Sequence, residues 1–183
     1  MNFEDQPHLT GETLTLAPMT AEDFEPLYLA ASDPGIWAGH PVKDRHKRDV
    51  FRPYFDFLLT AGGSLVARDI NSKAVIGCSK YYVAPARPDD IAIGFTFLAR
   101  AYWGGASNFD LKRAMVDHAL KSFGSVWFDI DPVNFRSQAA TLKIGAVHRY
   151  DCEMILAQDP YMWKCYELTA RNWAATCAAR GAL

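Results

Sequence analysis

The sequence predicts a mixed α/β fold in a single domain, with the element order β-α-α-β-β-β-α-β-α-β-β. Short segments with alternating apolar residues are typical of strands, and segments with apolar residues three or four apart are typical of amphipathic helices. The two kinds of segment are interleaved along the chain, which favours a mixed sheet covered by helices. The 183 residues suffice for one domain with a sizeable core. We expect that domain to cover residues 9–168, with residues 169–183 forming an alanine-rich helical tail.

The first half of the chain predicts two helices framed by strands. Thr20 is a good N-cap with Asp23 three residues on, and Pro53 is expected to start or kink the second helix. The polar residues 71–73 predict the turn of a β-hairpin. In chain order we expect a strand over 13–19, a helix from 20 to Asp33-Pro34, a helix over 44–60, strands over 64–70 and 74–83, a loop with two prolines over 84–89, and a strand over 91–99.

The second half of the chain alternates strands and helices. An inward apolar stripe is formed by Leu111, Met115, His118 and Ala119, so His118 is expected to be a satisfied core histidine. In chain order we expect a glycine turn at 104–105, a helix over 107–123, a strand over 125–131, a helix over 136–143, a turn at 145, and strands over 146–157 and 161–168 joined by a turn at Asp159-Pro160.

Composition and charge limit the functional classes. The net charge of -2 and the pI of about 6.2 argue against broad capture of nucleic acid or of an anionic membrane. No apolar run approaches the ~18 residues of a membrane span, and the acidic N-terminus lacks signal-peptide features. The four cysteines form no CxxC pair and have no zinc spacing. We therefore expect a reduced, cytoplasmic protein without a metal.

The segment from Phe95 to Ala106, followed by the helix that begins near Ser107, is the main functional signal. Glycines let a backbone approach an anion closely, and the free N–H groups of a first helical turn point toward it. A strand, a Gly104-Gly105 turn and a helix can therefore hold a pyrophosphate. The alternative is that these glycines form only a turn.

Three segments together resemble the GCN5-related N-acetyltransferase (GNAT) superfamily, and the nearest branch is similar to ribosomal-protein N-acetyltransferases. The segments are residues 93–106 (IGFTFLARAYWGGA), 134–146 (NFRSQAATLKIGA) and 32–37 (SDPGIW), the last with His40-Pro41 nearby. The resemblance implies a GNAT-like fold. It also implies an enzyme that moves an acetyl group from acetyl-CoA directly to a primary amine, on a protein N-terminus or a small molecule.

The resemblance also implies where the cofactor binds. The phosphate signature of the superfamily is Gln or Arg, two residues, Gly, one residue, and Gly or Ala. Gly104 and Ala106 match its last two places, whereas the first place falls on Ala101, with Arg100 one residue away on another face. Backbone groups of Phe97 and Leu98 would pair with the pantetheine arm, and Asn134 would bond its far end. The pyrophosphate would be wrapped by Trp103, Gly104, Gly105, Ala106, Ser107 and Asn108.

Attack of an amine on a thioester needs an oxyanion donor and a proton for the leaving thiolate. A bulge of the fourth predicted strand, near Leu98, could expose the N–H donor. Ser137, at the Asn-x-x-Ser position of the family, is the candidate acid. Its alternative role is that of an N-terminal cap of the following helix.

The general base is less evident. Relatives often carry Glu where this chain has Ala92. Asp90 lies on the same face of the strand, about 6.6 Å earlier, and is either a base acting through water or a solvated charge. His40 is a second candidate because histidine titrates near neutrality, and its alternative role is packing or substrate shape. Proton loss directly to water would make a base unnecessary.

Other conspicuous residues have structural interpretations. Three tryptophans, Trp37, Trp127 and Trp163, are expected in the core or in pocket walls. Four cationic positions are expected on the solvated surface, with the last within reach of a CoA phosphate: Lys47, Arg48, Arg87 and Arg113. Two other functions stay open, namely an acyl-CoA-binding module with little or no activity and an interaction protein with a purely structural glycine turn. A homodimer is compatible with the sequence.

Overall fold

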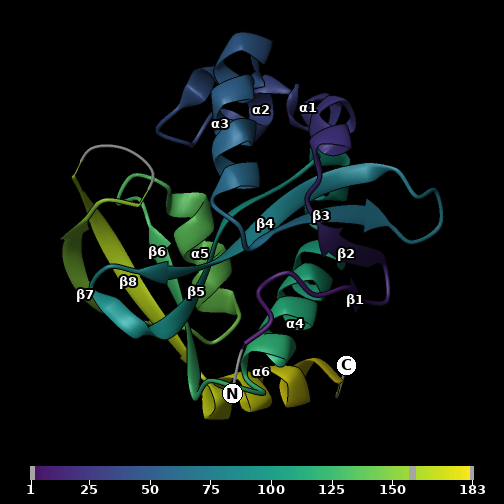
Figure 1. Ribbon diagram of the computed structural model, residues 1–183. Coiled ribbons are helices and arrows are strands. Elements are labelled where there is room, and N and C mark those ends of the chain that lie inside the picture. The colour runs from purple at the N-terminus through teal and green to yellow at the C-terminus, as the bar shows by residue number, and fades with distance from the viewer. Residues whose placement is uncertain (1–2, 157–159, 182–183) are drawn as a thin grey trace.

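The computed structural model of the chain describes residues 3–156 and 160–181. One eight-stranded sheet has the order β1-β2-β3-β4-β5-β6-β8-β7, and helices cover both of its faces (Figure 1). The strands are β1 (Leu9–Thr10), β2 (Leu14–Pro18), β3 (Ser64–Asp69), β4 (Val75–Ala84), β5 (Arg87–Leu98), β6 (Ser125–Ile130), β7 (Val147–Met154) and β8 (Tyr161–Thr169). The α-helices are α1 (Phe24–Ala31), α2 (Pro34–Trp37), α3 (Arg48–Thr60), α4 (Ser107–Ala119), α5 (Phe135–Lys143) and α6 (Ala170–Gly181), and the 3-10 turns are η1 (Ala21–Asp23), η2 (Lys43–His46) and η3 (Arg100–Tyr102).

The predicted fold class and element order are confirmed. The Thr20 N–H donates to the Asp23 carboxylate at 2.8 Å, as the capping pattern predicts. Asp33-Pro34 ends one helix and starts another, because the Asp33 side chain accepts from the Gly35 N–H at 2.8 Å and Pro34 takes the first helical position. Pro53 neither starts nor delimits the second long helix, since α3 begins earlier, at Arg48.

One predicted loop was wrong, and one short strand was not predicted. The predicted proline loop over 84–89 is only a turn at residues 85–86, and β5 already begins at Arg87. Pro88 lies within that strand, where the register between β4 and β5 is irregular, so its missing N–H does not break a regular ladder. The strand β1 was not predicted. The predicted turn at Asp159-Pro160 lies partly outside the described residues.

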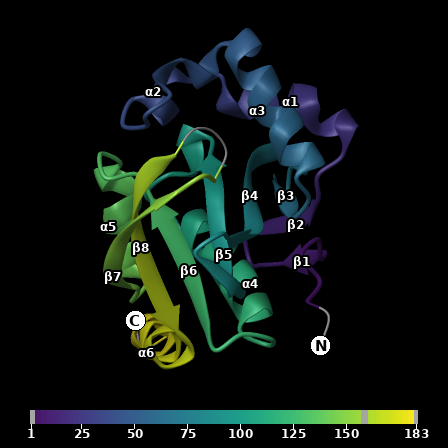
Figure 2. The same cartoon turned by 60° about the vertical axis from the view of Figure 1, so that its left-hand side comes forward.

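Two cores lie on opposite sides of the sheet. Helices α4 and α6 pack on one side against the larger core, which includes Leu111, Met115 and Trp173. Helices α1, α2 and α3 cover the other side, where Trp37 and Phe51 lie in a second core with Phe97 of β5. Figure 2 shows this second group of helices gathered over one end of the strands. The predicted inward stripe of α4 is confirmed for its aliphatic members.

The central parallel pair, β5 and β6, is joined along only part of its length. Its register pairs are Ile91 with Val126 and Ala92 with Trp127. Both strands continue toward their carboxyl ends, to Leu98 and Ile130, without further pairing between them. We call this separated part the β5–β6 opening. Carboxyl ends of parallel strands are the usual place for ligands in α/β sheets.

A β-bulge bends β5 within the opening. Phe95 and Thr96 together oppose the single residue Ser79 of β4, because the register steps from Lys80–Gly94 to Cys78–Phe97. Phe95 adopts φ 53, a left-handed conformation that is rare for a residue other than glycine. Bulges reorient backbone groups and occur often beside active sites. The predicted bulge therefore exists, but it lies earlier along the strand than Leu98.

Candidate functional site

The glycine turn presents a row of unpaired backbone donors. Gly104 has φ 72, which a residue with a Cβ rarely adopts, and neither it nor Gly105 has an atom within 4 Å of the position that a Cβ would take. The N-cap of α4 is Ala106, whose side chain cannot cap the helix. Within the described part of the chain, the N–H groups from Gly104 to Phe109 have no protein acceptor. This turn can therefore bind an anion through its backbone alone.

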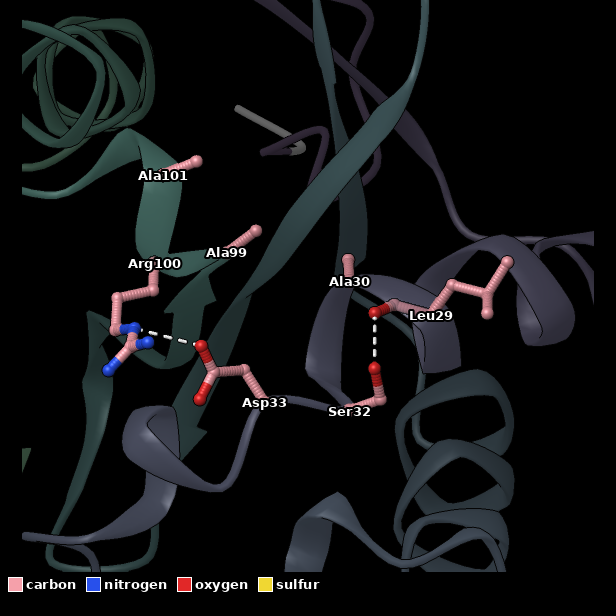
Figure 3. Close-up of a pocket in the computed structure, with 7 residues that line it drawn as sticks. All are labelled: Leu29, Ala30, Ser32, Asp33, Ala99, Arg100 and Ala101. Atoms are coloured by element: carbon pink, nitrogen blue, oxygen red, sulfur yellow. Dashed lines mark hydrogen bonds and ion pairs between the residues drawn. The ribbon is translucent and has the colours of Figure 1, made fainter.

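The charge of Arg100 is paired with Asp33 rather than available to an anion at this turn. Its Nε lies 2.8 Å from the Asp33 carboxylate at the start of α2. Figure 3 shows the two side chains meeting beside a shallow surface hollow, whose wall includes Ala99 and Ala101. Ala101, at the first place of the phosphate signature, is exposed. Anion binding at the turn thus depends on the backbone donors rather than on an arginine at the signature position.

Of the two residues whose backbone was predicted to pair with the pantetheine arm, only Leu98 has backbone groups that point away from β4. The Phe97 carbonyl oxygen faces β4, since a Cβ on Gly77 would lie 2.0 Å from it. Backbone groups alternate in direction along a strand, so those of Leu98 point away from β4. The Leu98 carbonyl accepts from the Trp103 indole N–H at 2.8 Å. This bond fixes the glycine turn to the strand end.

The start of α5 lies beside the glycine turn. The Arg136 guanidinium lies 4.0 Å from the centre of the Trp103 ring and donates to the Ile36 carbonyl at 2.9 Å, so it connects α5 to both the turn and α2. Asn134 caps α5, because its side-chain oxygen accepts from the Ser137 N–H at 3.2 Å. Ser137 is therefore not the cap. Its half-buried hydroxyl has no partner among the described residues.

The bulge is held by groups that the sequence did not single out. The Tyr54 hydroxyl donates to the Phe95 carbonyl at 3.3 Å from the α3 side. On the α4 side, Thr96 Oγ1 lies 2.7 Å from the Ser79 hydroxyl. The bulge thus has polar partners on both faces of the sheet, which limits how far its backbone can move.

Lys112 of α4 extends to the opening. Its Nζ donates to Thr96 Oγ1 at 3.3 Å on β5 and lies 4.9 Å from the centre of the Phe128 ring on β6. No carboxylate lies within ion-pair distance of Lys112 in the described ranges. Burial lowers the pKa of Lys112 to about 7. This amine was not predicted from the sequence, because Lys112 follows the buried Leu111 by one position and its partners come from other elements.

His40 is a poor base in this structure. The Val42 N–H donates to His40 Nδ1 at 3.0 Å, and Arg45 Nη1 lies 3.2 Å from His40 Nε2. Burial, with the charges of Arg45 and Arg136, lowers the pKa of His40 to about 3. The ring is therefore neutral near pH 7 and has little tendency to take a proton.

Asp90 is separated from the bulge by the joined half of β5. Five positions along a strand, from Asp90 to Phe95, span about 16 Å, which is too far for direct proton transfer. Ala92 is buried and packs with Trp127 and Cys165. Asp129 of β6 is the carboxylate nearest in register to the missing glutamate, but its side chain is fully buried and ion-paired. No free carboxylate at these positions serves as an evident base.

Arg87 contradicts its predicted surface position. Its guanidinium binds both carboxylate oxygens of Asp129 at 2.6 Å, donates to the Tyr150 hydroxyl at 2.9 Å and lies 4.4 Å from the Trp127 ring centre. The Tyr82 hydroxyl donates to the same carboxylate at 3.0 Å. The partners come from distant strands, so a local reading of the sequence could not find them.

The remaining predicted positions have ordinary structural roles. His118 is half-buried, and its Nε2 lies 2.8 Å from the Glu4 carbonyl. Arg113 pairs with Glu12 at 2.8 Å. Trp37 is buried and Trp163 half-buried, each with its indole N–H bonded to a backbone carbonyl.

No cluster of His, Cys, Asp and Glu with metal-binding geometry occurs in residues 3–156 or 160–181. None of the helices described is long and apolar enough to cross a membrane.

Comparison with known proteins identifies the family. The sequence profile of the acetyltransferase (GNAT) domain matches residues 13–147. A GCN5-related N-acetyltransferase from Brucella melitensis superposes with a TM-score of 0.81 at 14% identity, covering 99% of this chain and 86% of that one. Mycobacterium smegmatis RimJ, solved in complex with CoA-disulfide, has a TM-score of 0.62 at 16% identity, with 96% and 93% covered. No curated protein matched the sequence.

Proposed function

The chain belongs to the GNAT acetyltransferase family, and from this premise we propose that it transfers an acetyl group from acetyl-CoA directly to a primary amine in the cytoplasm. The observation that carries the proposal is the uncapped row of N–H groups from Gly104 to Phe109, at the end of a strand that separates from its parallel neighbour. This is the arrangement that a pyrophosphate and an extended cofactor arm require.

In this proposal the chain holds acetyl-CoA by three sets of groups. The backbone from Trp103 through Asn108 binds the pyrophosphate. Leu98 pairs with the pantetheine arm as an added strand would, with Phe97 fixing the strand against β4. Asn134 bonds the end of the arm. Arg113 is paired with Glu12 and is left out of this set.

The reacting groups lie at the bulge and at the start of α5. An N–H of the segment Phe95–Thr96 donates to the developing oxyanion of the thioester carbonyl. The amine bonds to the acyl carbon, the carbon–sulfur bond breaks, and the Ser137 hydroxyl gives its proton to the departing thiolate. Ser137 recovers a proton from solvent or from the acceptor amine.

Deprotonation of the acceptor is assigned to water. His40 is a weak base here, and Asp90 lies too far from the bulge to act directly. An α-amine, with a pKa of ~8, yields more free base near pH 7 than a lysine side chain, with a pKa of ~10.4. With neither His40 nor Asp90 acting as the base, the proposal favours a protein N-terminus or a small α-amine as acceptor.

Titration with acetyl-CoA and the release of free thiol with a panel of amines test the proposal. Gly105→Asp adds a negative charge at the turn and should weaken acetyl-CoA binding at least about tenfold. Gly124→Asp is the matched control, because that exposed glycine also has open space at its Cβ position. Equal affinity in the two folded variants would exclude the turn as the pyrophosphate site.

A second candidate is an acyl-CoA-binding module with little or no catalytic activity. Ala92 and the fully paired Asp129 favour it, because they leave the expected position of the base without a free carboxylate. Tight acetyl-CoA binding without thiol release from any amine would support this candidate. Absence of acetyl-CoA binding would instead favour an interaction protein with a structural glycine turn.

A further inference from the structure

Arg45 is a cation near the bulge that has no counterion among the described residues. Its guanidinium carbon lies 3.9 Å from the centre of the Tyr54 ring and 5.3 Å from that of Trp37. Its Nε is buried without a hydrogen-bond partner. Within residues 3–156 and 160–181, no carboxylate lies within ion-pair distance of it. The side chain as a whole is half-buried. Charged groups removed from water are usually paired, so the unpartnered Nε and the missing carboxylate call for an explanation.

His40 gives Arg45 no counter-charge. The His40 ring is neutral near pH 7, with Nδ1 facing the Val42 N–H at 3.0 Å and Nε2 facing Arg45 Nη1 at 3.2 Å. A neutral ring has one acceptor nitrogen, so it takes at most one hydrogen bond from the guanidinium. The other donors of the guanidinium keep their hydrogen-bonding capacity for another group.

A second unpaired guanidinium adds to the positive field. Arg136 lies over Trp103 and donates only to the Ile36 carbonyl, and it too lacks a carboxylate partner among the described residues. Both arginines act on His40 and lower its pKa. Arg45 comes from η2 and Arg136 from α5, so two elements far apart in sequence bring positive charge to one place.

We propose that Arg45, assisted by Arg136, binds a carboxylate carried by the acceptor, so that the amine substrate is an anionic one. The proposal rests on the proposed function and names its substrate class. Tyr54 connects Arg45 to the bulge where the reaction is proposed to occur, because its ring contacts Arg45 and its hydroxyl donates to the Phe95 carbonyl. An acidic side chain or a nearby α-carboxylate would be held beside the bulge, where the amine must attack.

A cofactor phosphate is the other source of an anion. The backbone donors from Gly104 to Phe109 already offer a phosphate site at the start of α4, whereas Arg45 comes from η2 and contacts Tyr54 and Trp37. We therefore assign Arg45 to the acceptor. Binding of acetyl-CoA should not depend on it.

Matched amine pairs test the assignment. Asp-Ala-Ala-amide and Asn-Ala-Ala-amide differ in one carboxylate, as do glycine and glycinamide. For the wild type, kcat/KM should be about 10- to 100-fold higher for the anionic member of at least one pair, the range for a charge-assisted hydrogen bond. Arg45→Met should remove this preference by raising the acceptor KM, whereas Arg45→Lys should keep part of it. Arg48→Met, an exposed arginine of α3, is the control for net charge.

A binding measurement with succinate tests the proposal even if none of the amines reacts. Succinate should raise the melting temperature of the wild type and of Arg48→Met but not that of Arg45→Met. Asp159 lies outside the described residues, so Asp159→Asn is measured alongside. Selectivity or succinate binding that appears only in Asp159→Asn would identify an internal counterion and overturn the proposal.

Three further outcomes overturn it. One is equal kcat/KM within both amine pairs in the wild type, with no effect of succinate. The second is a loss of acetyl-CoA affinity in Arg45→Met, which would assign the arginine to a cofactor phosphate. The third is an equal loss, in Arg45→Met and Arg48→Met, of the preference in kcat/KM for the anionic amine. Failure of the wild type to bind acetyl-CoA would instead reject the proposed function, which the succinate arm does not measure.

Discussion

Arg87 and Arg45 each stack on aromatic rings, but only Arg87 has a carboxylate partner among the described residues. Arg87 lies over Trp127 with both carboxylate oxygens of Asp129 at 2.6 Å. Arg45 lies over Tyr54 and Trp37 without a carboxylate among the described residues. Both guanidinium groups have a buried Nε without a hydrogen-bond partner, so the difference between them is the carboxylate. A paired buried cation is typical of structure, and a cation without a carboxylate partner is a candidate for ligand binding.

The same contrast separates two groups of residues around the β5–β6 pair. One group of residues is paired or packed within the chain, namely the Arg87–Asp129 pair and Ala92, although Asp129 itself lies past the last register pair, Ala92–Trp127. The other group comprises the bulge, Lys112 and the Ser137 hydroxyl, which has no partner among the described residues. Substitutions in the first group should cost stability, and those in the second should change activity or pH dependence instead. The following predictions test that division.

Asp129→Asn should have the largest effect. Removing one partner of a buried pair leaves Arg87 uncompensated and should cost about 3–5 kcal/mol of unfolding free energy. Urea denaturation measures it, with Asp151→Asn in an exposed pair as the control, for which a much smaller loss is expected. The double variant Arg87→Met/Asp129→Leu should recover much of the loss. A loss in Asp129→Asn no larger than in the control would refute the structural role of the pair.

Ser137→Ala should lower kcat about 100-fold, the usual worth of general-acid help, with little change in acetyl-CoA affinity or melting temperature. Asn134 supplies the helix cap, so removal of the Ser137 hydroxyl leaves the start of α5 intact. Steady-state kinetics and calorimetry on the same preparation check both parts. An unchanged kcat with a lower melting temperature would move Ser137 to the structural side of the comparison.

Lys112→Met should stabilise the protein in a pH-dependent manner. The folded-state pKa of about 7 lies below the ordinary lysine value, so the unfolded chain binds the proton more tightly. This penalty is complete below about pH 7 and disappears as the pH approaches ~10.4. The gain from Lys112→Met should therefore be larger at about pH 6 than at about pH 10 in urea denaturation. A difference independent of pH would show that the amine is not held neutral by burial.

Asp90→Asn should have the smallest effect. The distance along β5 puts this carboxylate outside direct reach of the bulge, so its removal should change kcat/KM less than about twofold, as for an ordinary surface substitution. The pH–rate profile of the variant should overlay that of the wild type. Loss of the acidic limb of that profile would restore Asp90 as the base and would require a water chain along the strand.

The parts that sequence reasoning found depend on local chemistry. The glycine turn and the helix that follows it near Ser107 involve neighbouring residues, so motif and spacing were sufficient to place them. The cap of α5 was considered only for Ser137 from the sequence, whereas the structure has Asn134 in that role. Arg87, Lys112 and Arg45 could not be found from motif and spacing. Their partners or missing partners come from strands and helices far away in sequence. The bulge also reverses side-chain alternation along β5, which limits any inference from Asp90 toward Leu98.

The scarcity of register pairs between β5 and β6 has a consequence for cooperativity. The eight strands form two blocks, β1 to β5 and β6 to β8, which the ladder connects only at Ile91–Val126 and Ala92–Trp127. A ligand arm bonded to both strand ends would act as a missing strand and connect the blocks. Amide protons near Leu98 and Ile130 should then exchange with solvent much more slowly in the complex, as binding to the native state alone raises the cost of opening. Because the larger apolar core is shared by both blocks, the ligand arm would protect these strand ends against local opening rather than join two separately folded units.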